Sequence, residues 1–217
     1  MSSDKSWVLS KISADSGFAL DLGGGRGELC SPLRELGYDY VNIDLEPSGG
    51  GLRVKGNAEL LPFASDTFDL IISSDTLEHF SQPAVVLSGV HRVLKDQGRL
   101  VIWVPFLHPF HSNDYFRYTP LGLQMLMERA NLRMVSLEAP LGLFSLIAQA
   151  WIVLFRRVGL GFMEPWLERA AAWVDCRLSP LQEGMSFAAA YLVVACKSSE
   201  SRISGLRGVS EGRAHVP

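Results

Sequence analysis

The sequence has few cysteines, and their spacing excludes two common ways of stabilising a small protein. Cys30, Cys176 and Cys196 are far apart, without a CxxC pair and without a neighbouring histidine cluster. This pattern fits neither a disulfide framework nor a zinc site. We interpret the three side chains as thiols of a reducing compartment, and we expect no metal site.

The sequence also lacks an apolar run long enough to cross a membrane. The longest one, 141–155, is interrupted by Ser145 and Gln149, and a spanning helix needs roughly 20 apolar residues. The first residues, MSSDKSWVLSKISADSG, are polar and have no signal-peptide core. We therefore expect a cytoplasmic protein, with the inner face of the membrane as an alternative location.

Basic residues are not gathered into a stripe, and the formal net charge is -3. A chain of this kind has little electrostatic attraction for the phosphate backbone of a nucleic acid, so we expect no nucleic-acid partner. The length of 217 residues suits one α/β domain. We predict this domain over 1–197 and a disordered tail over 198–217, where Ser, Gly and Arg dominate.

What the sequence does contain is an alternation of short apolar runs with helix-compatible segments. Seven strands are predicted, at 18–22, 40–44, 52–55, 68–73, 99–104, 133–138 and 188–195. Three helices are predicted between them, at 27–36, 82–94 and 119–130. We expect Gly98 to end the second helix, and Thr119 and Pro120 to open the third. The pattern predicts a Rossmann-like α/β fold, with a seven-stranded, mostly parallel sheet and helices on both faces.

A helical insertion, 140–187, separates the last two predicted strands. Its first half is apolar on every side and is interpreted as a buried lid. The alternative is peripheral membrane contact through 141–157, with Trp151 at the interface and Arg156 and Arg157 near the head groups. The second half, 164–178, has apolar residues at helical spacing, flanked by two tryptophans; they are Leu167, Ala170, Ala171 and Val174, with Trp166 and Trp173.

The most informative segment is ALDLGGGRGE, residues 19–28, in which a buried strand ends in a glycine turn and a helix begins. Glycine lets a ligand approach the backbone and permits positive φ angles. The free N–H groups of the helix attract an anion such as a carboxylate. Glycines at 23, 25 and 27 give G-x-G-x-G, whereas a dinucleotide turn has the spacing G-x-G-x-x-G.

The second predicted strand ends in Asp44. A carboxylate at this place can accept hydrogen bonds from both hydroxyls of a ribose. The structural alternative is an aspartate that caps a turn or the next helix.

Four features, in this order, resemble the class I S-adenosylmethionine-dependent methyltransferases, and particularly their small-molecule branch, type 11. They are LDLGGGRG, Asp44, GNAELLPF and FDLIISSDTLEHF. The resemblance implies S-adenosylmethionine as the cofactor. It further implies that Gly23 and Gly25 line the cofactor, that Asp21 orients its methionine amine, and that Asp44 holds its ribose.

The same resemblance implies roles for two further pairs. Asn57 and Ala58 would contact the edge of the adenine, and Ser74 and Asp75 would lie near the methionine and the reacting centre. The family often has Asp where this chain has Asn57, and an amide can both donate and accept.

A polar segment, PFLHPFHSNDYFRYTP at 105–120, follows the fifth predicted strand. Ligands bind at the carboxyl ends of such strands, so we expect an acceptor pocket here. His111 is the preferred general base, and His108 and Asp114 are further catalytic candidates. The alternative is that Asp114 forms an ion pair with Arg117, and His79 is expected to have a positioning role.

The pattern HxxxDYFRYTP resembles methyltransferases of sugar and cell-envelope biosynthesis, which implies a saccharide or glycolipid acceptor. We therefore predict transfer of a methyl group to a small-molecule, saccharide or lipid-linked acceptor, on oxygen. Two alternatives stay open. One is a non-catalytic S-adenosylmethionine-binding module, and the other is an NAD-dependent oxidoreductase, which the glycine spacing disfavours.

Overall fold

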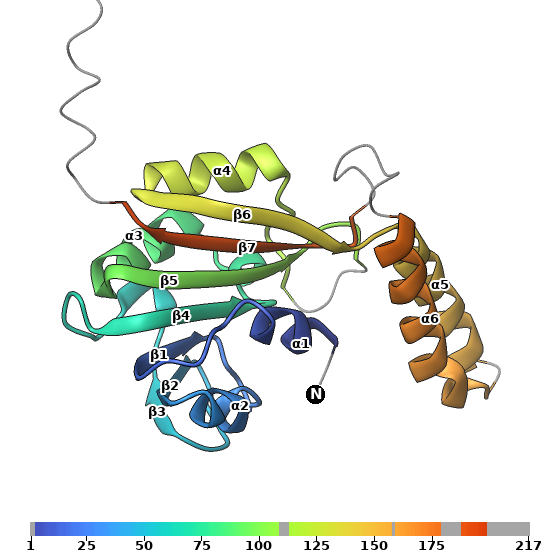
Figure 1. The fold of residues 1–217 in the computed structure, drawn as a ribbon, viewed down its shortest axis with the longest axis horizontal. Helices are drawn as coiled ribbons and strands as arrows, with labels where there is room; N and C mark the ends of the chain where they lie inside the picture. The colour runs from blue at the N-terminus through green and yellow to red at the C-terminus, as the bar shows by residue number, and fades with distance from the viewer. Residues whose placement is uncertain (1–2, 109–112, 158, 179–187, 199–217) are drawn as a thin grey trace, which may run out of the picture.

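The computed structural model describes residues 3–108, 113–157, 159–178 and 188–198. A single seven-stranded sheet forms the body of the molecule (Figure 1). Its strands are β1 Gly17–Leu22, β2 Tyr38–Asp44, β3 Leu52–Lys55, β4 Phe68–Ser74, β5 Leu94–Pro105, β6 Leu132–Leu141 and β7 Ala190–Lys197. Of the predicted tail, 199–217 lies outside the described residues.

The strand order is β3-β2-β1-β4-β5-β7-β6. The first four pairings are parallel, and β7 runs antiparallel to both β5 and β6. This confirms the predicted Rossmann-like, mostly parallel sheet. The carboxyl ends of β1, β2 and β4 lie at one edge, where open α/β sheets bind ligands.

Helices cover both faces of the sheet. They are α1 Ser3–Leu9, α2 Cys30–Glu35, α3 Pro83–Val93, α4 Pro120–Arg129, α5 Leu143–Arg157 and α6 Glu164–Leu178. Short 3-10 turns complete the chain, η1 Ala58–Leu60, η2 Leu77–His79 and η3 Gly161–Met163. The structure confirms a helical insertion before the last strand, in the form of α5 and α6.

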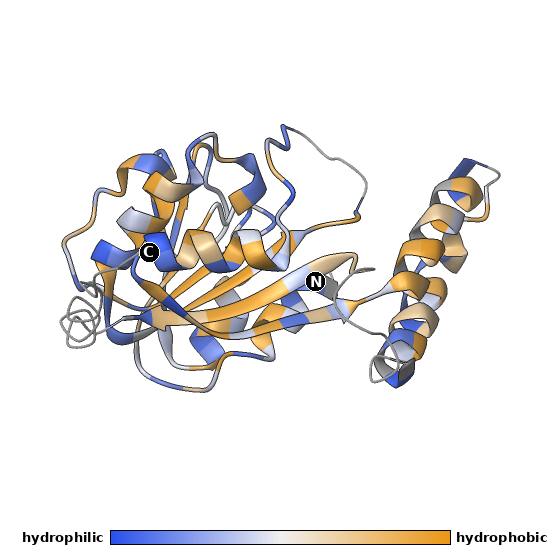
Figure 2. Ribbon diagram, turned by 90° about the horizontal axis from the view of Figure 1, so that it is seen from above, coloured by the Kyte–Doolittle hydropathy of each residue, from blue (hydrophilic) through white to orange (hydrophobic). Residues whose placement is uncertain are grey.

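Two apolar clusters make the core because successive side chains of a strand point to opposite faces. On β4, Ile71 joins the cluster under α3 and α4, whereas Leu70 and Ile72 join the one under α1 and α2. The strands are accordingly apolar along most of their length (Figure 2). Burial on both faces explains why the parallel strands were readable as apolar runs.

The structure corrects the predicted bounds of two helices. The helix predicted at 27–36 begins only at Cys30, because Gly27 has a φ of +66°, outside the helical region. The helix predicted at 82–94 ends at Val93, and Gly98 lies within β5 rather than ending the helix. Phe68 of β4 pairs with Leu94 of β5, and Leu70 pairs with Arg99. The register therefore shifts between these two pairs, and the additional residues of β5 form an irregularity there.

Helix α1 was not predicted. Its sequence is polar, but Val8 is fully buried among residues of α2 and the sheet. Trp7 and Leu9 pack against the same cluster, but three consecutive apolar residues at 7–9 do not have the spacing that signals a helix.

Helices α5 and α6 form a hairpin that stands at one end of the sheet (Figures 1 and 2). The buried carboxylate of Asp175, on α6, closes its base. It accepts hydrogen bonds from the backbone N–H of Gly142 at 2.9 Å, of Phe144 at 3.1 Å and of Ser145 at 2.9 Å, and from the Ser145 hydroxyl at 2.6 Å. One side chain thus satisfies the free N–H groups at the start of α5.

The interpretation of 141–155 as a buried lid is wrong for the helix as a whole. Ala148 and Ile152 are buried, but several large apolar side chains of α5 face solvent. Among the described residues, no helix has the length and apolarity required to cross a membrane.

Candidate functional site

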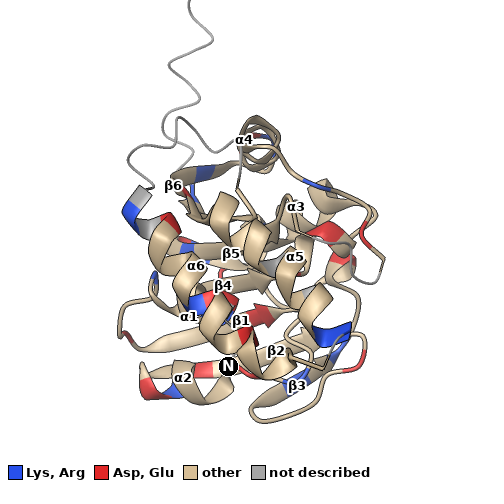
Figure 3. Cartoon of the chain, turned by 90° about the vertical axis from the view of Figure 1, so that its right-hand side faces the viewer, with Lys and Arg blue, Asp and Glu red and all other residues tan. Residues whose placement is uncertain are grey.

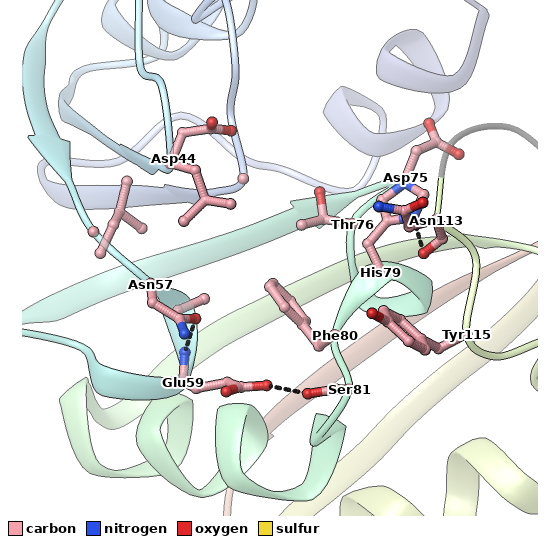
Figure 4. Close-up of a pocket in the computed structure, with 15 residues that line it drawn as sticks. Asp44, Asn57, Glu59, Asp75, Thr76, His79, Phe80, Ser81, Asn113 and Tyr115 are labelled. Atoms are coloured by element: carbon pink, nitrogen blue, oxygen red, sulfur yellow. Dashed lines mark hydrogen bonds between the residues drawn. The ribbon is translucent and has the colours of Figure 1, made fainter.

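A cavity of about 560 Å³ lies at the carboxyl ends of β1, β2 and β4 (Figure 4). Five of the predicted site residues line it: Gly23, Asp44, Asn57, Ala58 and Asp75. Asp21, Gly25 and Ser74 are not on its wall. The structure therefore brings together residues from four chain segments, each at or after the end of a strand, as the strand-end rule predicts.

The glycine turn is tightly built. Gly23 has a φ of +73°, and its N–H donates to the Ile43 carbonyl at 2.8 Å. A Cβ at this position would lie 2.2 Å from Cγ2 of Thr76. Glycine is thus required both by the backbone angle and by contact with the segment that follows β4.

Asp44 is held by the turn that it faces. Its Oδ2 accepts a hydrogen bond from the Gly25 N–H at 3.0 Å, and its Oδ1 accepts one from the Glu46 N–H at 2.9 Å. The turn-capping interpretation is therefore correct, but these two hydrogen bonds do not use all the acceptor positions of the carboxylate. A carboxylate has about four acceptor positions, so both oxygens can still accept from a ligand in the cavity.

Asp21 lies beneath the glycine turn. It is buried, and its Oδ2 accepts a hydrogen bond from the Tyr40 hydroxyl at 2.6 Å. A Cβ on Gly24 would come within 2.5 Å of the same oxygen. Burial raises the pKa of Asp21 to about 6, although the Tyr40 hydrogen bond acts in the opposite direction. The contacts of Asp21 support the turn from below.

The segment at the other side of the cavity is anchored by Asn57 and Glu59. The Asn57 Oδ1 caps η1 by accepting from the Glu59 N–H at 2.9 Å. The Glu59 carboxylate accepts from the Ser81 hydroxyl at 3.0 Å. Ala58 and Phe80 also line the cavity, and the Phe80 ring lies between Asn57 and Thr76 (Figure 4).

Asp75 follows β4 in a left-handed conformation, with a φ of +51°. Its N–H donates to the Trp103 carbonyl at 3.0 Å, and the Ser74 hydroxyl donates to its Oδ2 at 3.5 Å. Burial, and then the nearby charge of Asp4, raise the pKa of Asp75 to about 7. Asp75 also lines a second cavity, of about 180 Å³, together with Trp103 and His108.

The side chain of Asp114 does not line the large cavity; it is buried and contacts two partly exposed groups. Its Oδ2 accepts from Arg117 Nη2 at 2.6 Å, and its Oδ1 lies 3.1 Å from His79 Nδ1. The alternative interpretation, an ion pair between Asp114 and Arg117, is confirmed. His79 itself lines the large cavity. His111 lies outside the described residues.

Glu78 is fully buried next to His79. Burial raises its pKa to about 8, and the neighbouring charges of Asp75 and Asp114 act in the same direction. Its backbone carbonyl accepts from the Tyr115 N–H at 2.9 Å, and the Tyr118 hydroxyl donates to the Leu77 carbonyl at 3.0 Å. These bonds fasten the 113–118 segment to η2.

Sequence reasoning missed several side chains on the cavity wall, namely Leu45, Thr76, Phe80, Asn113 and Tyr115. Leu45 and Thr76 directly follow predicted site residues, so their neighbourhood was a usable signal. Asn113 and Tyr115 lie in the 105–120 segment, where an acceptor pocket was expected, although neither residue was singled out as a candidate.

Comparisons with known proteins agree with this geometry. A family profile described as a methyltransferase domain matches residues 8–159. An uncharacterized methyltransferase of Mycobacterium tuberculosis is 29% identical over 107 residues, which are 44% of this chain and 42% of that protein. A demethylmenaquinone methyltransferase of Renibacterium salmoninarum is 32% identical over 123 residues, 52% of this chain and 51% of that protein. This chain thus spans about half or less of the length of these relatives.

Among solved structures, an S-adenosylmethionine dependent methyltransferase from Mesorhizobium loti superposes with a TM-score of 0.61. The two chains are 17% identical, and the match covers 90% of this chain and 98% of the other. At this identity the likeness is one of fold.

Proposed function

The chain belongs to the methyltransferase-domain family and has the class I methyltransferase fold, and on this premise we propose that it transfers a methyl group from S-adenosylmethionine to an acceptor oxygen. The observation that carries the proposal is the single cavity that joins Gly23, Asp44 and the Asn57–Ala58 pair. The acceptor we propose is a small molecule, a saccharide or a lipid-linked saccharide.

The residues around the cavity suit the parts of this cofactor. Asp44 is fixed by two backbone N–H groups and has acceptor positions left for a ribose diol. Ala58, Phe80 and Leu45 supply apolar surface for an adenine ring. Asp75 lines the same cavity, and burial raises its pKa to about 7, so an ammonium group bound next to it would favour the ionised carboxylate.

Bound S-adenosylmethionine supplies a methyl group already activated on a sulfonium sulfur. The chain therefore has mainly to bind the two substrates, to orient them and to take up the proton of the acceptor hydroxyl. Glu59 and Asn57 fix one wall of the cavity, and the Glu78 carbonyl fixes the segment that carries Tyr115. These contacts restrain the segments that carry the cavity wall.

We further propose His79 as the general base that takes the proton from the hydroxyl group of the acceptor. Its Nδ1 lies near two acceptors, the Asp114 carboxylate at 3.1 Å and the Asn113 carbonyl at 3.3 Å. With the hydrogen on Nδ1, the neutral ring has its lone pair on Nε2, which lies 3.9 Å from Oε1 of Glu78 and would receive the proton. His108 borders the smaller cavity and, like His111, stays a candidate for the acceptor side.

Calorimetry with S-adenosylhomocysteine tests the cofactor site. We expect binding by the wild type and a loss of about 10–100-fold in affinity in Asp44→Asn, because a hydrogen bond to a charged group is worth about 1.5–3 kcal/mol. Asp39→Asn is the matched control, since Asp39 is exposed on the same strand β2. If the folded wild type gives no heat with the cofactor or its product, the proposal fails; a response to NADH would favour the oxidoreductase.

Transfer of a radiolabelled methyl group to a panel of hydroxyl-bearing acceptors tests the reaction. His79→Gln should lower kcat and leave the affinity for S-adenosylhomocysteine unchanged. Unaltered turnover would exclude His79 as the base. Cofactor binding without transfer to any acceptor would favour the non-catalytic module.

A further inference from the structure

The outer face of helix α5 is an apolar stripe in contact with solvent. Leu143, Ile147, Trp151 and Leu154 are all exposed, and their spacing of three or four residues places them on one side of the helix. The opposite side, with Ala148 and Ile152, is buried. Side chains of this size rarely gather on a solvent-facing surface unless another surface covers them.

Tryptophan is concentrated on the same hairpin. Trp151 is 50% exposed, and Trp166 and Trp173 on α6 are 67% and 62% exposed. Phe162, between the two helices, is also exposed. Tryptophan prefers the interface between water and lipid, where its ring meets apolar chains and its N–H meets water.

The charged residues that the hairpin exposes to solvent are mainly arginines. Arg156, Arg157, Arg169 and Arg177 are exposed. Of the acids at 143–178, Asp175 is buried, Glu164 forms an ion pair with Arg156, and Glu168 alone is exposed. Helix α5 has no charged residue before Arg156, which is visible when the molecule is viewed from the side of the hairpin (Figure 3).

We propose that the α5–α6 hairpin docks on the surface of an anionic phospholipid bilayer. The apolar stripe and the tryptophans enter the head-group layer, and the arginines contact lipid phosphates. At 15 residues each, the helices are too short to span the bilayer. The hairpin therefore lies on the membrane.

The charge pattern also argues against a second copy of the chain as the occupant of this surface. A two-fold interface brings the same patch of each subunit against itself. Outside the Arg156–Glu164 ion pair, three exposed arginines and one exposed glutamate would then face their own copies, and like charges across an interface are unfavourable. An anionic bilayer supplies the complementary charge.

The base of the hairpin adjoins the proposed acceptor side of the protein. Leu141, which precedes α5, lines the smaller cavity with Asp75 and His108. Docking therefore brings this edge of the protein to the membrane surface. A lipid-linked acceptor fits that position, a consequence that rests on the proposed function, whereas the docking itself does not.

Co-sedimentation with vesicles tests the proposal. The full chain should sediment with vesicles of phosphatidylglycerol and phosphatidylcholine, and much less with phosphatidylcholine alone. Ile147→Glu, in the centre of the stripe, should weaken binding at least about tenfold, because a charge is placed in the apolar contact. Arg157→Glu should weaken binding to the anionic vesicles specifically.

Leu121→Glu is the matched control, since Leu121 is 77% exposed on α4, outside the hairpin. This variant should bind vesicles as the wild type does. Absence of wild-type binding would overturn the proposal, and so would an equal loss in Leu121→Glu. A dimer in light scattering that Ile147→Glu dissociates would also overturn it, in favour of self-association. Calorimetry with S-adenosylhomocysteine on Ile147→Glu separates this outcome from failure of the cofactor site.

Discussion

The parallel half of the sheet and the α5–α6 hairpin differ in where their apolar side chains lie, buried in the first and partly exposed in the second. Strands β1 and β4 bury apolar side chains on both faces, and the N–H groups that follow them, of Gly23 and Asp75, donate to backbone carbonyls of neighbouring strands. In the hairpin, one side of α5 is buried and the other is an exposed apolar stripe. The sheet is thus completed within the chain, whereas the hairpin has a surface suited to a contact outside it.

A substitution that creates a cavity in the centre of the sheet should have the largest effect on stability. Ile71 is fully buried on β4, and Ile71→Ala should lower the free energy of unfolding by about 2–5 kcal/mol. Urea denaturation measures the change, and Ile71→Val should cost about 0.5–1.5 kcal/mol as the graded control. Similar values for the two variants would show that this site collapses around the cavity.

The base of the hairpin should show a smaller and more local effect. Asp175→Ala removes four hydrogen bonds to the start of α5, and it should cost about 1–3 kcal/mol. Hydrogen exchange should become faster in α5 and stay unchanged in β1 and β4. Glu168→Ala, at an exposed position of the same helix, is the control. Faster exchange throughout the sheet would contradict the separation of the two regions.

The pH dependence of the stability should show the ionisation of the Asp75 carboxyl group. Its pKa is raised from 3.8 to about 7 in the folded chain, so between these values the folded state binds more protons than the unfolded state. The contribution of this group to the free energy of unfolding is therefore complete below about pH 4 and is lost as the pH rises toward 7. Asp75→Asn should melt a few degrees above the wild type at pH 8, and the difference should vanish near pH 4. A constant difference at all pH values would contradict this assignment.

The smallest effect is expected on the apolar stripe. Trp151→Ala removes a large but half-exposed side chain, and it should change the free energy of unfolding by less than about 1 kcal/mol. The same variant should bind anionic vesicles more weakly. A cost as large as that of Ile71→Ala would mean that Trp151 stabilises the fold itself, and the contrast between the regions would disappear.

The sequence predicted the parallel half well because its signals are local. Strands buried on both faces read as apolar runs, and Gly23, Asp44 and Asp75 could be placed by their positions at strand ends. Leu52–Lys55 was predicted with its observed bounds, and the helix at 164–178 as well.

Features that depend on distant contacts were not predictable from local patterns. Asp175 binds the chain 30 residues upstream, and Tyr115 reaches the cavity through a bond to Glu78. The early start of β5 depends on an irregular segment in which Gln97 has a φ of +66°. Glycine and asparagine, not glutamine, are the usual residues in that conformation, so nothing in the sequence indicated it.

The position of β7 has a consequence for the order of assembly. β7 comes after β6 in the chain but lies between β5 and β6 in the sheet. Until β7 is made, β5 can pair only with β4 and β6 has no strand partner, so both present unpaired backbone to other nascent chains. Emergence of 190–197 joins them in one step, so truncation within this strand should convert a folding chain into an aggregating one.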